Sequence, residues 1–132
     1  RAFHHTGPGQ APTYAIADWV QQVKTGHETL RVGNVHVTRD YMDVRDTVRA
    51  YALLAEKGRG GGIYNVCTGV ERSLESIALS LTGQYNMSLS ITRARQREGD
   101  VGRMYGSAEK LRALGWQPTI AFEQTLEDML QG

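Results

Sequence analysis

Two arginines, Arg39 and Arg97, are the side chains of this sequence best suited to binding an anion. A guanidinium group is always charged, and its rigid fork of donors matches the oxygens of a phosphate or carboxylate in pairs. We expect each arginine to lie in a loop that follows a strand, where α/β proteins bind ligands. Two arginines that converge from separate loops would clamp a diphosphate. The plainer alternatives are a solvated, charged helix start at Arg39 and a solvated loop at residues 93–103.

The other reactive side chains give weaker indications. His4 and His5 are adjacent on an expected strand, so their side chains should face opposite sides and should not both line one pocket. His27 and His36 are expected at the surface. Cys67 is the single cysteine, which excludes an internal disulfide, and without paired Cys/His spacing the sequence predicts no zinc site. No spacing of serine, histidine and acid indicates a nucleophilic triad.

The glycine-rich run Gly58-Arg59-Gly60-Gly61-Gly62 has the wrong order for a phosphate loop. A helix is expected to lead into it and a strand to leave it. A dinucleotide-binding fingerprint needs the reverse order, because the phosphate sits on the N-terminus of the helix that follows the glycines. We therefore expect a plain connector.

Composition limits the classes of function. Of 132 residues, 40% are hydrophobic and 22% are charged, which is typical of a globular protein, and we expect one domain over residues 1–132. A net charge of +1 argues against an extended nucleic-acid interface. No apolar run is long enough to span a membrane, so we expect a cytoplasmic protein. The chain starts at Arg1 where a strand is expected, which suggests a missing segment upstream.

Helices and strands alternate in the expected element order, which indicates an α/β domain of short strands with five helices. Asp43 is expected to cap a helix that buries Val44, Val48, Tyr51 and Ala55, with Asp46 completing a weak capping box. The other expected elements are strands at 1–5, 30–37 (with a turn at Gly33-Asn34), 63–67 and 89–92, and helices starting near Tyr14, Ser73, Ser107 and Phe122.

An ordered set of motifs over nearly the whole chain resembles the C-terminal half of an extended short-chain dehydrogenase/reductase acting on nucleotide sugars. Within it, the nearest pattern is the GDP-4-keto-6-deoxy-mannose reductase and GDP-mannose 4,6-dehydratase group. The motifs are Arg1-Ala2-Phe3-His4-His5-Thr6-Gly7-Pro8-Gly9-Gln10, Val32-Gly33-Asn34, Arg39-Asp40-Tyr41-Met42-Asp43-Val44-Arg45-Asp46, Tyr64-Asn65-Val66-Cys67-Thr68-Gly69 and Leu114-Gly115-Trp116-Gln117-Pro118.

The resemblance implies substrate-binding roles for five residues. Arg39 would hold the diphosphate of a GDP-sugar, Arg97 would be its second clamp, and Asp100 would face the ribose. His4 stands where the family has asparagine, and Asn34 belongs to the turn that favours the GDP-sugar branch. Glu98 replaces a family proline and would weaken the phosphate site through its negative charge.

The resemblance also implies that this chain lacks the catalytic parts of the family. The NADP- or NAD-binding glycine motif and the Tyr-x-x-x-Lys pair belong upstream of Arg1, and none of the six tyrosines has a lysine four residues later. Proton donation needs a phenol with a lowered pKa, and hydride transfer needs the nicotinamide. We expect no cofactor to bind this chain alone and no catalysis by it alone.

Two functions remain open. The first is the GDP-sugar recognition part of an NAD(P)-dependent reductase or dehydratase, with the Rossmann half absent. The alternative is a stand-alone, non-catalytic binding or assembly module derived from that family, expected to be a homodimer because apolar faces must be hidden.

Overall fold

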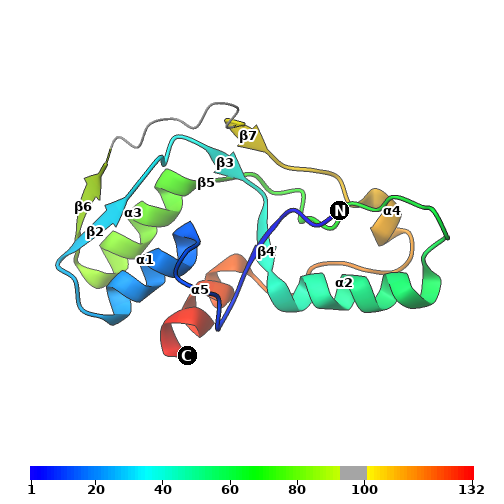
Figure 1. Ribbon diagram of the computed structural model, residues 1–132, viewed down its shortest axis with the longest axis horizontal. Coiled ribbons are helices and arrows are strands. Elements are labelled where there is room, and N and C mark those ends of the chain that lie inside the picture. The colour runs from blue at the N-terminus through cyan, green and yellow to red at the C-terminus, as the bar shows by residue number, and fades with distance from the viewer. Residues whose placement is uncertain (93–100) are drawn as a thin grey trace.

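The computed structural model describes residues 1–92 and 101–132, which form short strands and five helices (Figure 1). The expected α/β class is confirmed. The strands are β1 (His4–Thr6), β2 (Thr29–Val32), β3 (Thr38–Arg39), β4 (Tyr41–Asp43), β5 (Arg72–Ser73), β6 (Ser88–Ile91) and β7 (Arg103–Met104), and the helices are α1 (Ala15–Lys24), α2 (Val44–Lys57), α3 (Leu74–Tyr85), α4 (Glu109–Arg112) and α5 (Phe122–Gln131).

The described strands form small sheets, and consecutive strands β3 and β4 belong to two of them. β1 pairs in parallel with β4, and β2 pairs in parallel with β6. The third sheet has the order β5-β3-β7, in which β5 is antiparallel and β7 parallel to β3. Asp40 separates β3 from β4, so the segment from Thr38 to Asp43 joins two sheets in the middle of the molecule.

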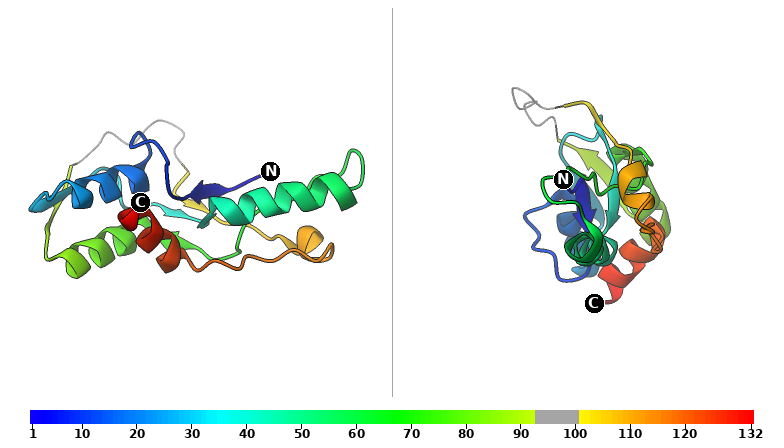
Figure 2. Two further views of the ribbon diagram at one scale, coloured as in Figure 1. Left: turned by 90° about the horizontal axis from the view of Figure 1, so that it is seen from below. Right: turned by 90° about the vertical axis from the view of Figure 1, so that its right-hand side faces the viewer.

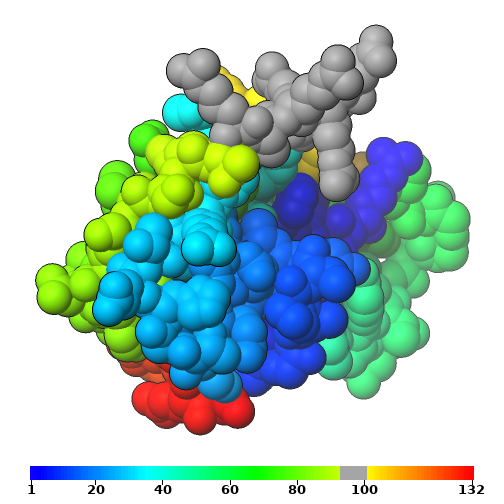
Figure 3. Space-filling model, turned by 60° about the vertical axis from the view of Figure 1, so that its left-hand side comes forward, coloured from blue at the N-terminus to red at the C-terminus, as the bar shows by residue number. Residues whose placement is uncertain are grey.

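The molecule is elongated, with a hydrophobic cluster toward each end. At one end α1, α3 and the β2–β6 pair lie together with α5, and at the other end α2 runs beside α4 (Figures 1 and 2). The side chains of α1 and β2 form adjoining parts of one surface (Figure 3). The first cluster contains Trp19 and Phe122, and the second contains Met42, Cys67 and Trp116. That residues 1–132 form one domain stays a prediction.

Helices α2 and α3 begin at the expected capping residues. The Asp43 carboxylate accepts a hydrogen bond from the Arg45 backbone N–H at 2.8 Å, and the Ser73 hydroxyl accepts from the Ser76 N–H at 2.9 Å. α2 ends at Gly58, as expected. α3 continues past Gly83, although glycine commonly ends a helix, and stops at a left-handed cap at Asn86.

The predicted buried face of α2 is wrong. Val48 is 59% exposed and Tyr51 is 51% exposed. The face that turns inward carries Asp46, Thr47 and Ala50 instead. The rotation of the helix is explained by the hydrogen bonds of Asp46. Its carboxylate accepts from backbone N–H groups of a distant loop, so this side of α2 must face the protein interior.

Strand pairing also differs from the expectation. The segment 30–37 is not a strand–turn–strand unit, because β2 ends at Val32 and pairs with β6, while Val35 and Val37 pack in the core without strand structure. The strand expected at 63–67 is reduced to one parallel bridge between Ala2 and Val66.

Candidate functional site

Three fully buried aspartates, Asp40, Asp43 and Asp46, form the frame of the candidate site. They are spaced three residues apart along the strand and the helix start that follow Arg39. Burying a carboxylate is costly unless hydrogen bonds compensate for the lost water. Each of these carboxylates receives several hydrogen bonds, and each binds a different distant segment of the chain.

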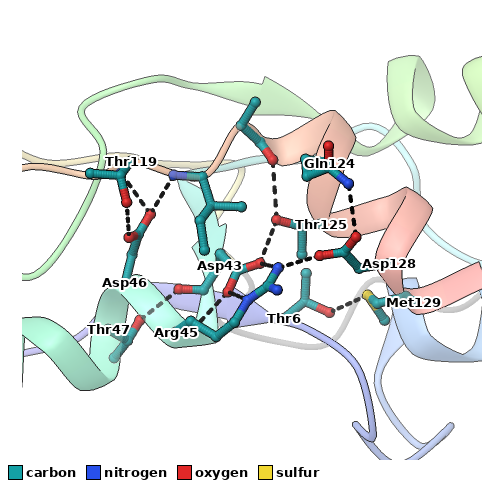
Figure 4. Close-up of polar contacts among 12 residues, drawn as sticks. Thr6, Asp43, Arg45, Asp46, Thr47, Thr119, Gln124, Thr125, Asp128 and Met129 are labelled. Atoms are coloured by element: carbon teal, nitrogen blue, oxygen red, sulfur yellow. Dashed lines mark hydrogen bonds and ion pairs between the residues drawn. The ribbon is translucent and has the colours of Figure 1, made fainter. Parts of the chain in front are cut away.

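Asp43 fixes α5 against β4 and α2. Its carboxylate accepts hydrogen bonds from Arg45 Nε at 2.8 Å and from the Thr125 hydroxyl at 2.8 Å, and Arg45 also reaches Asp128 at 2.6 Å (Figure 4). Burial by itself would raise the pKa of Asp43, but the hydrogen bonds from Arg45 and Thr125 outweigh it and hold the pKa below its ordinary value.

Asp46 fixes the loop between α4 and α5. Its carboxylate accepts from the backbone N–H groups of Thr119 and Ile120, both at 3.0 Å (Figure 4). It also forms an ion pair with Arg49 of α2. The indole of Trp116 donates to the Asp46 backbone carbonyl at 3.1 Å. Burial opposes ionisation, yet these donors lower the pKa of Asp46, so the carboxylate is a structural anchor. It does not act as the second member of a capping box, because its carboxylate bonds Thr119, Ile120 and Arg49 rather than the backbone N–H of Asp43.

Asp40 binds the segment that follows the Ala2–Val66 bridge. It accepts from the Thr68 backbone N–H at 2.9 Å, from the Thr68 hydroxyl at 2.6 Å and from the Gly69 N–H at 2.8 Å. Since neighbouring side chains of an extended chain point to opposite sides, holding Asp40 on one side directs Arg39 and Tyr41 to the other.

Arg39 is therefore placed by its neighbours in a strand and not in the expected loop. It is 8% exposed, and its NH1 group donates to the backbone carbonyls of Thr38 at 2.8 Å and Val101 at 2.7 Å. In the sheet, Arg39 is paired with Met104 of β7. These contacts hold the guanidinium group beside the start of β7.

A pocket of about 470 Å³ lies next to this strand. β1, the first turn of α1, Tyr41 and Met104 border it. Met104 lines the pocket and is also paired with Arg39. Because paired residues of neighbouring strands project from the same face, the side chain of Arg39 lies on the pocket side of the sheet. The pocket lining is Ala2, Phe3, His4, His5, Thr6, Gln10, Tyr14, Ala15, Ile16, Tyr41 and Met104.

His4 stands in this pocket as a neutral imidazole. Its ring meets the Tyr41 ring edge-on, with centroids 5.4 Å apart, and its Nδ1 atom is buried without a hydrogen-bond partner. Burial and then the charge of Arg39 lower the pKa of His4. The positive field of Arg39 therefore reaches the pocket.

The structure brings together only some of the five predicted site residues. His4 lines the pocket and Arg39 lies beside it. Asn34 lies in the loop after β2, where its side-chain oxygen accepts from the His36 N–H at 3.2 Å, and it is not part of the pocket lining. Arg97 and Asp100 lie outside the described residues. The expectation that His4 and His5 cannot border one pocket is wrong, since both do.

Sequence reasoning missed Tyr41, Gln10 and Met104 as pocket residues. Tyr41 could have been found, because it lies two positions after Arg39 in an extended segment and must share its side. Met104 could not, because only the pairing of β3 with β7 places it there.

The described residues contain neither a cluster of metal-ligating side chains nor a membrane-spanning helix. In residues 1–92 and 101–132, no group of three or more His, Cys, Asp or Glu side chains is placed to hold a metal ion. No helix in the described part of the chain has the length and apolar character needed to cross a membrane.

Comparisons with known proteins agree with the sequence motifs. The family model described as GDP-mannose 4,6 dehydratase matches residues 1–129. The GDP-6-deoxy-D-mannose reductase of Pseudomonas aeruginosa is 36% identical over 138 residues, covering 98% of this chain and 45% of the relative. The UDP-glucose 4-epimerase of Mycolicibacterium smegmatis is 30% identical, covering 89% of this chain and 39% of the relative. The chain thus spans less than half the length of these relatives.

Solved structures show the same correspondence. The structure of RMD from Pseudomonas aeruginosa complexed with NADPH matches with a TM-score of 0.87 and 35% identity, covering 99% of this chain and 46% of that one. The UDP-glucose 4-epimerase of Thermotoga maritima with UDP-glucose matches with a TM-score of 0.88 and 26% identity, covering 99% and 43%. The chain therefore belongs to the GDP-mannose 4,6-dehydratase family of extended short-chain dehydrogenases/reductases and corresponds to the C-terminal part of that fold.

Proposed function

We propose that this chain is the GDP-sugar recognition part of an NAD(P)-dependent reductase or dehydratase and is not catalytic by itself. The observation that carries the proposal is the pocket lined by His4 and Tyr41, with the buried, charged Arg39 directly beside it. A guanidinium group held in place by its own backbone contacts loses little freedom when it binds a phosphate. The pocket is large enough for part of a sugar nucleotide.

His4 has a specific place in this proposal. A buried N–H without an acceptor costs more than a buried lone pair without a donor. Since Nδ1 is buried and unpartnered, the proton of the neutral ring belongs on Nε2. His4 would then donate one hydrogen bond to the substrate, as the asparagine amide of the family could. Arg97, Asp100 and Asn34 keep their proposed roles as second clamp, ribose contact and branch-determining turn.

Within the described part of the chain, the glycine-rich run at 58–62 lacks the arrangement of a dinucleotide-binding loop. Gly58–Gly62 follows the C-terminal end of α2 and leads into an extended segment, so no helix N-terminus meets these glycines. We therefore derive no hydride-transfer step from this chain. RMD from Pseudomonas aeruginosa is complexed with NADPH, and a nicotinamide cofactor is the group that supplies hydride-transfer chemistry where it is bound.

Calorimetric titration with GDP and GDP-mannose tests the proposal. We expect both to bind, and Arg39→Ala to weaken binding by about 10- to 100-fold through loss of a charge-assisted contact. Arg31→Ala is the matched control, because Arg31 is an exposed arginine of β2. Circular dichroism must show that Arg39→Ala is folded, and Arg39→Lys provides a milder second variant. Absence of heat with both ligands for the unaltered protein would refute the proposal.

We further propose that two copies of the chain associate through the exposed face of α2, as the assembly-module alternative requires. Val48 and Tyr51 continue a stripe that starts at Val44 and ends at Ala55, and such a stripe can pack on its own copy about a two-fold axis. A cytoplasmic location also stays a proposal, consistent with the single, buried Cys67.

Light scattering after gel filtration tests this association. We expect the mass of a dimer for the unaltered protein and of a monomer for Tyr51→Glu, because the substitution buries a charge in the apolar contact. Leu79→Glu is the control, since Leu79 is a similarly exposed apolar residue (54%) on α3. A monomeric unaltered protein would contradict the proposal.

A further inference from the structure

Arg72 lies directly opposite Arg39 in the sheet. β3 and β5 are antiparallel, and their register pairs Arg39 with Arg72. Side chains of directly paired residues project from the same face, with Cβ atoms roughly 5 Å apart. Like charges directly opposite each other destabilise a sheet unless counter-charges offset them, so the partners of Arg72 matter.

The described acidic residues do not neutralise Arg72 well. Glu71 is engaged by Arg103 at 2.7 Å. Glu123 is the recorded ion-pair partner of Arg72, but its oxygen is 3.8 Å from NH1 and its side chain is 73% exposed. A solvent-exposed ion pair at that distance contributes little stabilisation.

One nitrogen of Arg72 also lacks a hydrogen-bond acceptor. Its Nε atom is buried and has no partner, although the side chain as a whole keeps 27% of its surface exposed. The guanidinium carbon lies 5.0 Å from the centre of the Phe122 ring. Packing on Phe122 fixes the orientation of the group but cannot satisfy Nε in its plane.

Two aromatic side chains, Phe122 and Tyr41, connect Arg72 with the pocket. Phe122 lies against Tyr41, with ring centroids 6.0 Å apart, and Tyr41 lines the pocket together with His4. On the other side of Arg39, Met104 lines the same pocket. An anion placed between Arg39 and Arg72 would therefore sit beside the space assigned to the ligand.

We propose that Arg72 is a second phosphate-binding residue that acts with Arg39 on the diphosphate of the nucleotide sugar, an inference that rests on the proposed function. A diphosphate that bridges the two guanidinium groups brings negative charge to Arg72 and offers an acceptor to its unpartnered Nε. The contribution is independent of Arg97, which lies outside the described residues.

Calorimetric titrations with GDP, pyrophosphate and guanosine separate this role from a structural one. Arg72→Met keeps the aliphatic stem over Phe122 and removes the charge. We expect it to weaken GDP binding by about 10- to 100-fold, to abolish measurable pyrophosphate binding and to leave guanosine binding unchanged. Arg72→Lys keeps the positive charge but lacks the paired donors of a guanidinium group. We expect its loss of GDP affinity to be about half that of Arg72→Met on a logarithmic scale. Arg31→Met is the control and should bind GDP like the unaltered protein.

The outcomes distinguish the two proposals. If Arg72→Met binds GDP as tightly as the unaltered protein while Arg39→Ala does not, the role of Arg72 is refuted and the proposed function stands. Equal loss of GDP and guanosine binding also refutes it, because that pattern indicates a structural effect. If Arg72→Met does not fold, the same comparison is made with Arg72→Lys. If the unaltered protein binds neither GDP nor pyrophosphate, both the proposed function and the role of Arg72 are refuted.

Discussion

Replacing Asp46 with alanine is expected to lower the free energy of unfolding by about 3–5 kcal/mol. The carboxylate is fully buried and accepts from the backbone N–H groups of Thr119 and Ile120 and from the Arg49 side chain. Its removal leaves the two backbone donors without an acceptor and takes the carboxylate away from Arg49, which keeps its hydrogen bond to the Gln117 carbonyl. The loop between α4 and α5 would then lose its attachment to α2.

Urea-induced unfolding, followed by circular dichroism at 222 nm, measures this loss. Glu127→Ala is the matched control, because it removes an exposed carboxylate from α5 and should change the free energy of unfolding by less than about 0.5 kcal/mol. Asp46→Asn keeps the shape of the side chain, and its loss of unfolding free energy should lie between those of Asp46→Ala and Glu127→Ala. A loss below about 1 kcal/mol for Asp46→Ala would show that Asp46 is not an anchor.

Acidification is expected to destabilise the protein through Asp43 and Asp46. The folded-state pKa of each is lowered from an ordinary value of 3.8. The unfolded chain therefore binds protons more readily, so the stabilisation is fully present above pH 3.8 and is lost as the pH falls through the lower folded values. His4 adds a loss of the same sign at higher pH, because its pKa is lowered from 6.5.

Unfolding curves between pH 7 and pH 2.5, measured with urea, test the assignment. The Asp43→Asn variant is expected to start less stable at pH 7 and to lose less stability below pH 3.8 than the unaltered protein, because one titrating group is gone. Glu127→Gln should follow the unaltered protein throughout. Parallel curves for Asp43→Asn and the unaltered protein would contradict the prediction.

The sequence by itself determined the presence of the helices, several of their ends and the family. Asp43, Ser73 and Gly58 act on backbone groups within a few residues, so their effects can be read from the local sequence. The apolar spacing of α1 and α5 indicates the faces that these helices pack into one cluster, whereas the buried Thr125 of α5, which donates to Asp43, follows no apolar pattern. The ordered motifs identified the family because they cover nearly the whole chain.

Only the tertiary structure decided which face of α2 is buried and which arginines stand together. The spacing of Val48 and Tyr51 predicts that they face the core. In the structure they are exposed, because the buried carboxylate of Asp46 needs its hydrogen-bond donors and these lie inside the protein. Arg72 gave no signal in the sequence, because its position opposite Arg39 arises from the pairing of strands more than thirty residues apart. Contacts of this kind form between segments that are far apart in the sequence. A local pattern of residue types therefore cannot predict them.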